Sequence, residues 1–373
     1  MDIFFPDWLS LLVINKIYQS AWLLATYRLI KLVLRLTTNT TELSRLCGTA
    51  AKGARHMAEA MERGGYEREK YALAEESEPK PGIVMVKGFE VQVPVDLVFR
   101  IDRSILYSKQ LMLERRELES KTCELDDVTK EILIKKRFPS FGSSRTLSAQ
   151  FLHASLGRIA DSYRLVGEIN SRVNTKYDSS NKAHERKLME VDLFTSRAHY
   201  AALWNAVMPN EKLESRNTLQ WQEIGFQGKN PATDFRGMGM LGLDDLLYYA
   251  RTYPDSAQNV LRSSRHSVSW YPFAISGIHI TKFAVQTLRT RQLQYFLFQY
   301  GTTKDVYHEF YCYLYHTFND FWTSHENLTA MDFEEKFRQF KIQVEQELLA
   351  RQVVTLGEME VREQEFGRKV KIG

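Results

Sequence analysis

Residues 221–243 form a glycine-rich stretch that limits what this 373-residue chain can fold into. Four glycines and Pro231 lie within its first nineteen residues. Glycine costs about 1 kcal/mol per site inside a helix and proline about 3 kcal/mol, so no long amphipathic helix spans this stretch. The stretch also contains many apolar side chains, which require burial. A flexible spacer would contain few of them. We therefore expect a loop of fixed shape that wraps a core and presents its polar groups at one place.

The polar residue of greatest interest in this loop is Arg236, which lies between Phe235 and Gly237. An arginine on a rigid loop is suited to donate its charge to a phosphate in another molecule, because the guanidinium is permanently ionised and presents several donors. The residue type alone leaves another interpretation open. Arg236 could instead be tied to Asp234 or to carbonyl groups of the loop.

The stretch resembles the signature of the ELMO domain, as found in the short ELMO-domain-containing proteins. The positions that fit this signature are Trp221, Ile224, Gly225, Phe226, Gln227, Pro231, Thr233, Asp234, Phe235, Arg236, Gly237, Gly239, Leu241, Gly242 and Leu243. The chain departs from it at Asn230, where the family has Asp; an asparagine keeps a turn-forming, capping or hydrogen-bonding role but not one that needs charge. The resemblance covers residues 183–352 and, more loosely, the helices before them.

The resemblance implies an activity. Short ELMO-domain-containing proteins are GTPase-activating proteins for small GTPases of the Arf and Arf-like families, and this activity depends on the motif arginine, here Arg236. This arginine finger would act in trans on the partner, which itself binds GTP and Mg²⁺, so no cofactor is expected in this chain. The alternative is a non-catalytic ELMO-type adaptor that binds small GTPases or their exchange factors at membranes.

The other signature residues are candidates for supporting the loop. Three glycines would shape it and three aromatic residues would anchor it: Gly225, Gly237, Gly239, Trp221, Phe226 and Phe235. Asn230 and Thr233 would support the turn. Asp234 would either orient Arg236 by a bidentate pair or brace the loop. Gln227 would either stiffen the loop by a hydrogen bond or orient the attacking water, a role that a glutamine of the GTPase normally fills.

Other chemistry finds little support. The sequence has no GxxxxGK[ST] motif, so we expect no nucleotide-hydrolysing site of its own. His308, Cys312 and His316 repeat at intervals of four residues, but they would span about 12 Å along a helix, too far for one metal ion, so we expect core packing and no metal. The net charge of +4 comes without a dense basic block, which gives no reason to expect nucleic-acid binding.

Residues 8–41 contain no acidic residue and carry four basic ones, Lys16, Arg28, Lys31 and Arg35. These lie within about a 120° arc of a helical wheel whose other faces are apolar. This pattern is typical of a helix at a membrane surface, with its basic edge toward anionic head groups. A membrane-spanning helix over residues 8–27 and a helix packed on the domain behind it stay open. The three scattered cysteines suggest free thiols in a reducing compartment, and hence a cytoplasmic protein. Together with the basic helix, they suggest a protein that is peripheral to or anchored on an intracellular membrane.

Helical periodicity prevails from residue 104 onward and predicts an all-α fold, a helical ELMO domain with an N-terminal helical extension. One helix is expected around residues 105–118, and another over residues 183–208 that ends at Pro209. The expected segments are a membrane-proximal helix (1–47), a charged linker with an extended segment (48–103), a helical extension packing on the core (104–182), the ELMO domain (183–352) and a charged tail (353–373).

Overall fold

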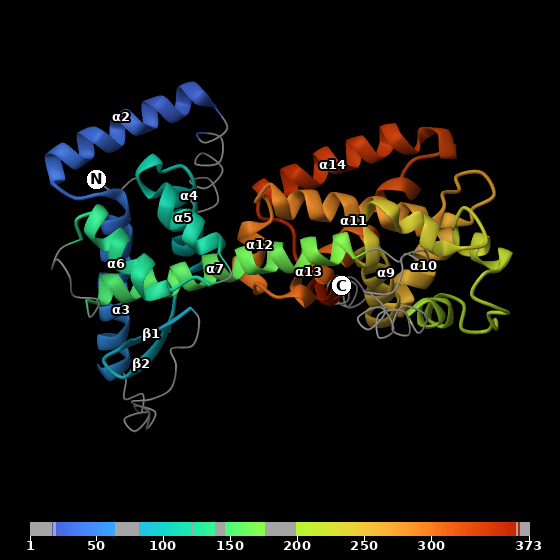
Figure 1. Ribbon diagram of the computed structural model, residues 1–373, viewed down its shortest axis with the longest axis horizontal. Helices are drawn as coiled ribbons and strands as arrows, with labels where there is room; N and C mark the ends of the chain where they lie inside the picture. The colour runs from blue at the N-terminus through green and yellow to red at the C-terminus, as the bar shows by residue number, and fades with distance from the viewer. Residues whose placement is uncertain are drawn as a thin grey trace, which may run out of the picture. The chain divides into compact units, whose positions relative to one another are not determined.

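The computed structural model describes residues 17, 20–63, 82–120, 122–138, 146–175, 199–362 and 365 (Figure 1). These residues are mostly helical, and their only sheet has two strands, so the predicted all-α class is confirmed. The chain divides into two compact units. The first comprises Met1–Leu165 with Leu297–Thr302, and the second comprises Val166–Phe296 with Thr303–Gly373. The second unit begins inside the segment 104–182, and the predicted segment boundaries stay predictions.

The first unit contains helices and a β-hairpin. Its elements are α2 (Ala21–Thr38), α3 (Glu42–Arg63), β1 (Ile83–Val86), β2 (Phe89–Gln92), α4 (Val95–Leu106), the 3₁₀ helix η1 (Lys109–Leu111), α5 (Met112–Glu119) and α6 (Leu125–Lys135). Helix α3 packs on α4 and on β1, and α5 packs on α4 and α6. Two helices, α7 (Leu147–Asn174) and α12 (Gln294–Tyr300), contribute residues to both units.

The extended segment after residue 82 is a hairpin. Val86 pairs with Phe89, and the two residues between them, Lys87 and Gly88, have φ of 52° and 87°. Positive φ at both central residues is what a type I′ hairpin turn requires, and this turn matches the twist of the strands. Pro94 lies past the second strand and is the N-cap of α4, so it interrupts no ladder.

The single helix expected around residues 105–118 is wrong. Helix α4 ends at Leu106, and the backbone of Ser108 is extended, with φ −86° and ψ 112°. Leu111 is fully buried in the turn that follows, and α5 starts only at Met112. Apolar residues resume directly after the polar residues 108–110, so their spacing alone does not reveal the break.

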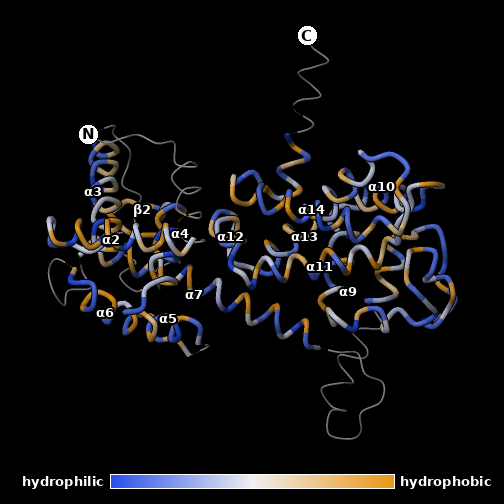
Figure 2. The backbone as a smooth tube through the Cα atoms, turned by 90° about the horizontal axis from the view of Figure 1, so that it is seen from above, coloured by the Kyte–Doolittle hydropathy of each residue, from blue (hydrophilic) through white to orange (hydrophobic). Residues whose placement is uncertain are grey.

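Helix α2 is exposed along its length. The Ser20 hydroxyl caps its start by accepting from the Leu23 N–H at 3.5 Å, and Asn39, with φ 50°, ends it. It has no buried residue and mixes hydrophobic with hydrophilic positions (Figure 2). In the part of the chain that the structure describes, no helix is sufficiently long and apolar to cross a bilayer. Residues 1–16, including Lys16, lie outside the described residues.

The second unit contains the 3₁₀ helices η2 (Leu219–Ile224) and η3 (Pro231–Gly237). A helical bundle follows them in the chain. Its main helices are α9 (Gly239–Thr252), α10 (Pro254–Ser264), α11 (Phe273–Arg289), α13 (Lys304–Thr323) and α14 (Phe333–Leu349), which follows the 3₁₀ helix η4 (Ala330–Asp332). Helices α9, α10, α11 and α13 pack on one another, and α14 packs on α13. Residues 183–198 lie outside the described residues, and the helix that continues to Val207 ends before Pro209, as expected.

Aromatic residues of α13 fill the centre of this bundle. Tyr307, Tyr311, Tyr315 and Phe318 are fully buried at spacings of three or four residues, which places them on one side of the helix. Ring contacts connect them with their neighbours, for example Tyr315 with Phe273 of α11 at 5.3 Å. This well-filled core provides a rigid support for the segment that precedes α9.

Candidate functional site

The glycine-rich stretch consists of two 3₁₀ helices and the first turn of α9, built over an aromatic cluster. Trp221, Phe226 and Phe235 are buried, as their residue types indicate. The ring centroids of Trp221 and Phe226 lie 5.5 Å apart, and so do those of Phe226 and Phe235, both with edge-to-face geometry. Tyr200 and Trp204 complete the cluster on Trp221. Edge-to-face pairs restrain the orientation of each ring, so the cluster fixes where the loop crosses the core.

Gly225 ends η2 in a conformation that only glycine accepts easily. Its φ is 84°, and a Cβ at this position would lie 2.5 Å from the backbone nitrogen of Phe273. The chain here passes directly against the start of α11. A side chain at residue 225 would force these two segments apart, which explains the glycine.

Asn230 begins the second 3₁₀ helix. Its side-chain oxygen accepts a hydrogen bond from the Ala232 N–H at 3.2 Å, and Pro231 occupies the first helical position. The Thr233 hydroxyl donates to the Asn230 carbonyl oxygen at 2.8 Å. Asparagine and aspartate both cap helix starts well, so the departure from the family pattern at this position preserves the cap.

Asp234 braces the loop and does not hold Arg236. Its carboxylate accepts from the Gln227 N–H at 2.8 Å and lies 3.4 Å from the Thr233 hydroxyl. The Gln227 carbonyl oxygen also accepts from the Gln222 side chain at 3.2 Å. Gln227 therefore ties the loop through its backbone, and within the described residues its side chain has no hydrogen-bond partner and is exposed. The pairing of Asp234 with Gln227 connects η3 to the turn after η2.

Arg236 is exposed on the outer side of η3. Its Nε donates to the Thr233 carbonyl oxygen at 2.7 Å, one turn earlier in the chain. Among the described residues it forms no ion pair, and its two terminal nitrogens have no partner. The inner part of the side chain is therefore held while the end of the guanidinium points to solvent. This arrangement can present two parallel donors to an oxyanion of another molecule.

Gly239 starts α9 where this helix meets the end of α7. Its φ is 55°, and a Cβ here would lie 2.2 Å from the Val173 carbonyl oxygen. The Met240 N–H donates to the Thr175 carbonyl oxygen at 3.0 Å. Gly237 differs, because a Cβ built on it would meet no atom of the described chain within 4 Å apart from its own chain neighbours. The structure thus gives a steric reason for glycine at residues 225 and 239 but not at 237.

An ion pair that the sequence does not reveal fixes the same junction. Arg172 at the end of α7 binds Asp244 of α9 through two hydrogen bonds, of 2.5 and 2.9 Å, and the Lys304 amino group lies 3.4 Å from the same carboxylate. Burial alone would raise the pKa of Asp244, but the hydrogen bonds from Arg172 and the nearby positive charges hold this pKa below its usual range. The partners are more than seventy residues apart in sequence, so no local pattern could have indicated the pair.

The three candidate metal ligands of α13 belong to the core instead. His308 and Cys312 are buried. The His308 Nδ1 lies 2.8 Å from a carboxylate oxygen of the buried Asp245, and the His316 Nδ1 lies 2.7 Å from the Ser256 hydroxyl. Their partners come from α9 and α10, so these histidines join helices. No group of three or more metal-ligating side chains occurs among the described residues.

A hollow of about 500 Å³ lies beside the loop in the second unit. One wall is formed by residues of η2 and the turn to Gln227, and the other by residues between Ser264 and Ile275. Arg265 donates two hydrogen bonds to the Glu223 carbonyl oxygen and so holds the walls together. Trp270 on the rim is 48% exposed, which is unusual for the largest apolar side chain.

The fold and the site together define a helical domain in which an arginine loop is anchored on buried aromatic rings. A profile of the ELMO/CED-12 family matches residues 167–337. ELMO domain-containing protein 2 of Homo sapiens is 34% identical to the chain over 258 residues, which cover 67% of this chain and 83% of the human protein. ELMO domain-containing protein B of Dictyostelium discoideum is 29% identical over 252 residues, 68% of this chain and 84% of that protein. The chain belongs to the ELMO/CED-12 family, which confirms the resemblance of the glycine-rich stretch.

Proposed function

We propose that this protein is a GTPase-activating protein for small GTPases of the Arf and Arf-like families, with Arg236 as its arginine finger. The observation that carries the proposal is the exposed guanidinium of Arg236, which within the described residues is bonded only through Nε and lies in a braced loop. The resemblance to the ELMO signature suggests the class of GTPase. On this proposal GTP and Mg²⁺ belong to the partner, and the chain acts at the cytoplasmic surface of an intracellular membrane.

The chemistry asked of Arg236 is electrostatic. Negative charge shifts among the phosphate oxygens as the bond to the γ-phosphate breaks, and a guanidinium fixed beside them stabilises that arrangement more than the ground state. Arginine fingers raise kcat by about 10³–10⁵, which corresponds to about 4–7 kcal/mol of the activation barrier. A loop already held by Asp234, Asn230 and Gly225 lowers the entropy that would be lost when the side chain is positioned.

The hollow beside the loop is the surface that we propose for the GTPase. It shares Gln227 with the loop, and the Gln227 N–H is bonded to Asp234, two residues before Arg236. A partner seated there would be in contact with the exposed Trp270, whose large apolar surface suits the centre of an interface. The GTPase would then bind at one part of a rigid element, and its GTP would be hydrolysed beside an adjacent part of the same element.

Single-turnover hydrolysis tests the proposal. A panel of GTP-loaded Arf and Arf-like proteins is mixed with the wild-type chain or with Arg236→Lys, because lysine keeps the charge but not the paired donors. Arg262→Lys, at another exposed arginine of the second unit, is the matched control. We expect acceleration by the wild type and the control, and a loss of about 10³-fold or more with Arg236→Lys.

Binding measured on the same panel separates an activator from an adaptor. We expect Arg236→Lys to bind the GTP-loaded partner nearly as well as the wild type does, because its effect falls on the transition state. Equal acceleration by Arg236→Lys and wild type would reject the finger. Binding to a GTP-loaded partner with no acceleration by any of these proteins would favour the adaptor.

A further inference from the structure

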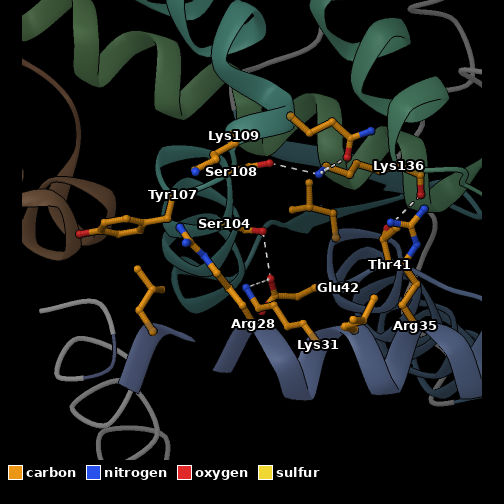
Figure 3. Close-up of a pocket in the computed structure, with 14 residues that line it drawn as sticks. Arg28, Lys31, Arg35, Thr41, Glu42, Ser104, Tyr107, Ser108, Lys109 and Lys136 are labelled. Carbon is orange, nitrogen blue, oxygen red and sulfur yellow. Dashed lines mark hydrogen bonds and ion pairs between the residues drawn. The ribbon is translucent and has the colours of Figure 1, made fainter. Parts of the chain in front are cut away.

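The first unit contains a basic pocket of about 420 Å³ between α2, the start of α3, the end of α4 and Lys136 after α6 (Figure 3). Five cationic side chains line it with a single carboxylate: Arg28, Lys31, Arg35, Lys109, Lys136 and Glu42. Figure 3 shows Arg28, Lys31 and Arg35 extending from α2 across the pocket toward the opposite wall. The pocket therefore holds a concentrated positive charge.

The carboxylate is already occupied by neighbours. Glu42 accepts hydrogen bonds from Tyr27 at 2.5 Å and Ser104 at 3.0 Å, and it pairs with Lys31 at 2.5 Å. In the described part of the chain, Arg28, Arg35 and Lys109 form no ion pair. One carboxylate neutralises one of the five cations, and the pocket keeps an excess of positive charge that an anion would balance.

Lys136, on the wall opposite α2, is affected by this excess of positive charge. Its amino group donates to the Ser108 hydroxyl at 3.1 Å and to the Gln110 side-chain oxygen at 2.9 Å, both uncharged acceptors. Burial, together with the positive charges of Arg35 and Lys31, lowers the pKa of Lys136. A bound anion would remove this repulsion.

A second face of α2 is apolar and open to solvent. Trp22, Leu29 and Leu36 are 75%, 60% and 75% exposed, and at 100° per residue their mean direction lies about 130° around the helix from that of Arg28, Lys31 and Arg35. Leu32 joins the two faces, because it lines the pocket and is still 51% exposed. The rim of the basic pocket is thus continuous with a stripe of exposed large hydrophobic residues, a surface of the kind that lies in a lipid interface.

We propose that this pocket binds the phosphorylated head group of an anionic lipid while the apolar face of α2 lies in the acyl boundary. The number of cations fits a head group with phosphomonoesters, since a single phosphodiester carries only one charge. A soluble anion would satisfy the cations but leave the apolar stripe in water, which favours the lipid. The proposal refines the expected membrane contact of residues 8–41, because the basic groups of α2 line a pocket rather than form a plain edge. It does not depend on the GTPase proposal.

Vesicle flotation of the full chain tests the head group. Phosphatidylcholine vesicles are compared with vesicles that also contain a phosphatidylinositol bisphosphate, or phosphatidylserine at equal total charge. We expect the strongest binding to the bisphosphate vesicles. Arg28→Gln/Arg35→Gln should weaken this binding about thirtyfold, because each of the two basic groups contributes about fivefold. Lys52→Gln/Arg55→Gln, exposed on α3 outside the pocket, changes charge equally and should bind nearly as wild type does.

If the two charge-removing double variants lost the same vesicle affinity, the pocket would not be a specific site and binding would be only a diffuse electrostatic attraction. The same conclusion would follow if the wild type bound the phosphatidylserine vesicles as strongly as the bisphosphate vesicles. A third variant, Leu29→Gln/Leu36→Gln, tests the lipid as the source. It should lose vesicle binding but keep the wild-type affinity for soluble inositol trisphosphate. Trisphosphate binding by the wild type without any flotation would overturn the lipid assignment. Hydrolysis by a soluble GTPase should be unchanged in all three variants, so a failure here is distinct from a failure of the arginine finger.

Discussion

The substitution Gly239→Ala tests the junction that holds the arginine loop on the second unit. The added methyl group would lie 2.2 Å from the Val173 carbonyl oxygen and 2.7 Å from that of Thr175. Both oxygens belong to backbone at the end of α7, so neither can move aside as a side chain would. The start of α9 must shift, and the hydrogen bond from Met240 to Thr175 must lengthen.

The expected loss of stability is the sum of three effects. A left-handed backbone costs alanine about 1 kcal/mol relative to glycine. The weakened backbone hydrogen bond costs about 1 kcal/mol, and loosening the Arg172–Asp244 pair at the same junction costs about 1 kcal/mol more. The total is about 3 kcal/mol, and at about 2–4 °C per kcal/mol for a domain of this size the melting temperature should fall by about 6–12 °C.

Thermal unfolding followed by circular dichroism measures this loss, and Gly237→Ala is the control. Apart from its own chain neighbours, the same methyl group at residue 237 meets no atom of the described chain within 4 Å, and φ at Gly237 is not positive. We expect the control to change stability by less than about 0.5 kcal/mol. If both substitutions lowered the melting temperature equally, the close approach of α9 to α7 would not be the reason for the glycine.

Three further predictions concern the same unit. Asp244→Asn should lower the free energy of unfolding by about 2 kcal/mol. This is less than the loss expected for a fully buried pair, because the Arg172 side chain is 24% exposed. The pKa of Asp244 is depressed in the folded protein, so its contribution is present above pH of about 4 and lost below it; unfolding by urea at several pH values should show a smaller acid-induced loss in the variant. Asn230→Ala should cost about 1 kcal/mol in the same assay through the lost cap on Ala232, whereas Asn230→Asp should keep it. Trp270→Ala should weaken binding of the GTP-loaded partner by about tenfold or more without lowering the melting temperature, and unchanged binding would exclude the hollow as the docking surface.

The helical periodicity of the sequence was enough to predict that the second unit is helical. Helix α10 begins at Pro254 and α9 stops just before it, as the restrictions on proline backbone require. The pattern failed between α4 and α5, where apolar residues on both sides of a short polar segment suggest one helix. There Leu111 is fully buried in a 3₁₀ turn, which the residue types do not indicate.

The candidate site could be predicted only in part for the same reason. The density of glycine indicated a loop, and apolar residue types indicated that Trp221 and Phe235 anchor it. The two interpretations of Asp234 differed by the direction of one side chain, which residue types do not specify, and the structure shows it bonded to Gln227. The clamp of Arg172 on Asp244 depends on two helices meeting in space, and no spacing along the chain encodes it.

The placement of Arg236 has a consequence for comparing members of this family. Its side chain is exposed, and among the described residues it forms one hydrogen bond, to the Thr233 carbonyl oxygen. Replacing it should therefore leave folding almost untouched, so a relative could lose this arginine over evolutionary time and still adopt the same architecture. Selection for stability alone would not retain it. On the function proposed above, the residue found at this one position would be a better guide to what a member of the family does than the presence of the domain itself.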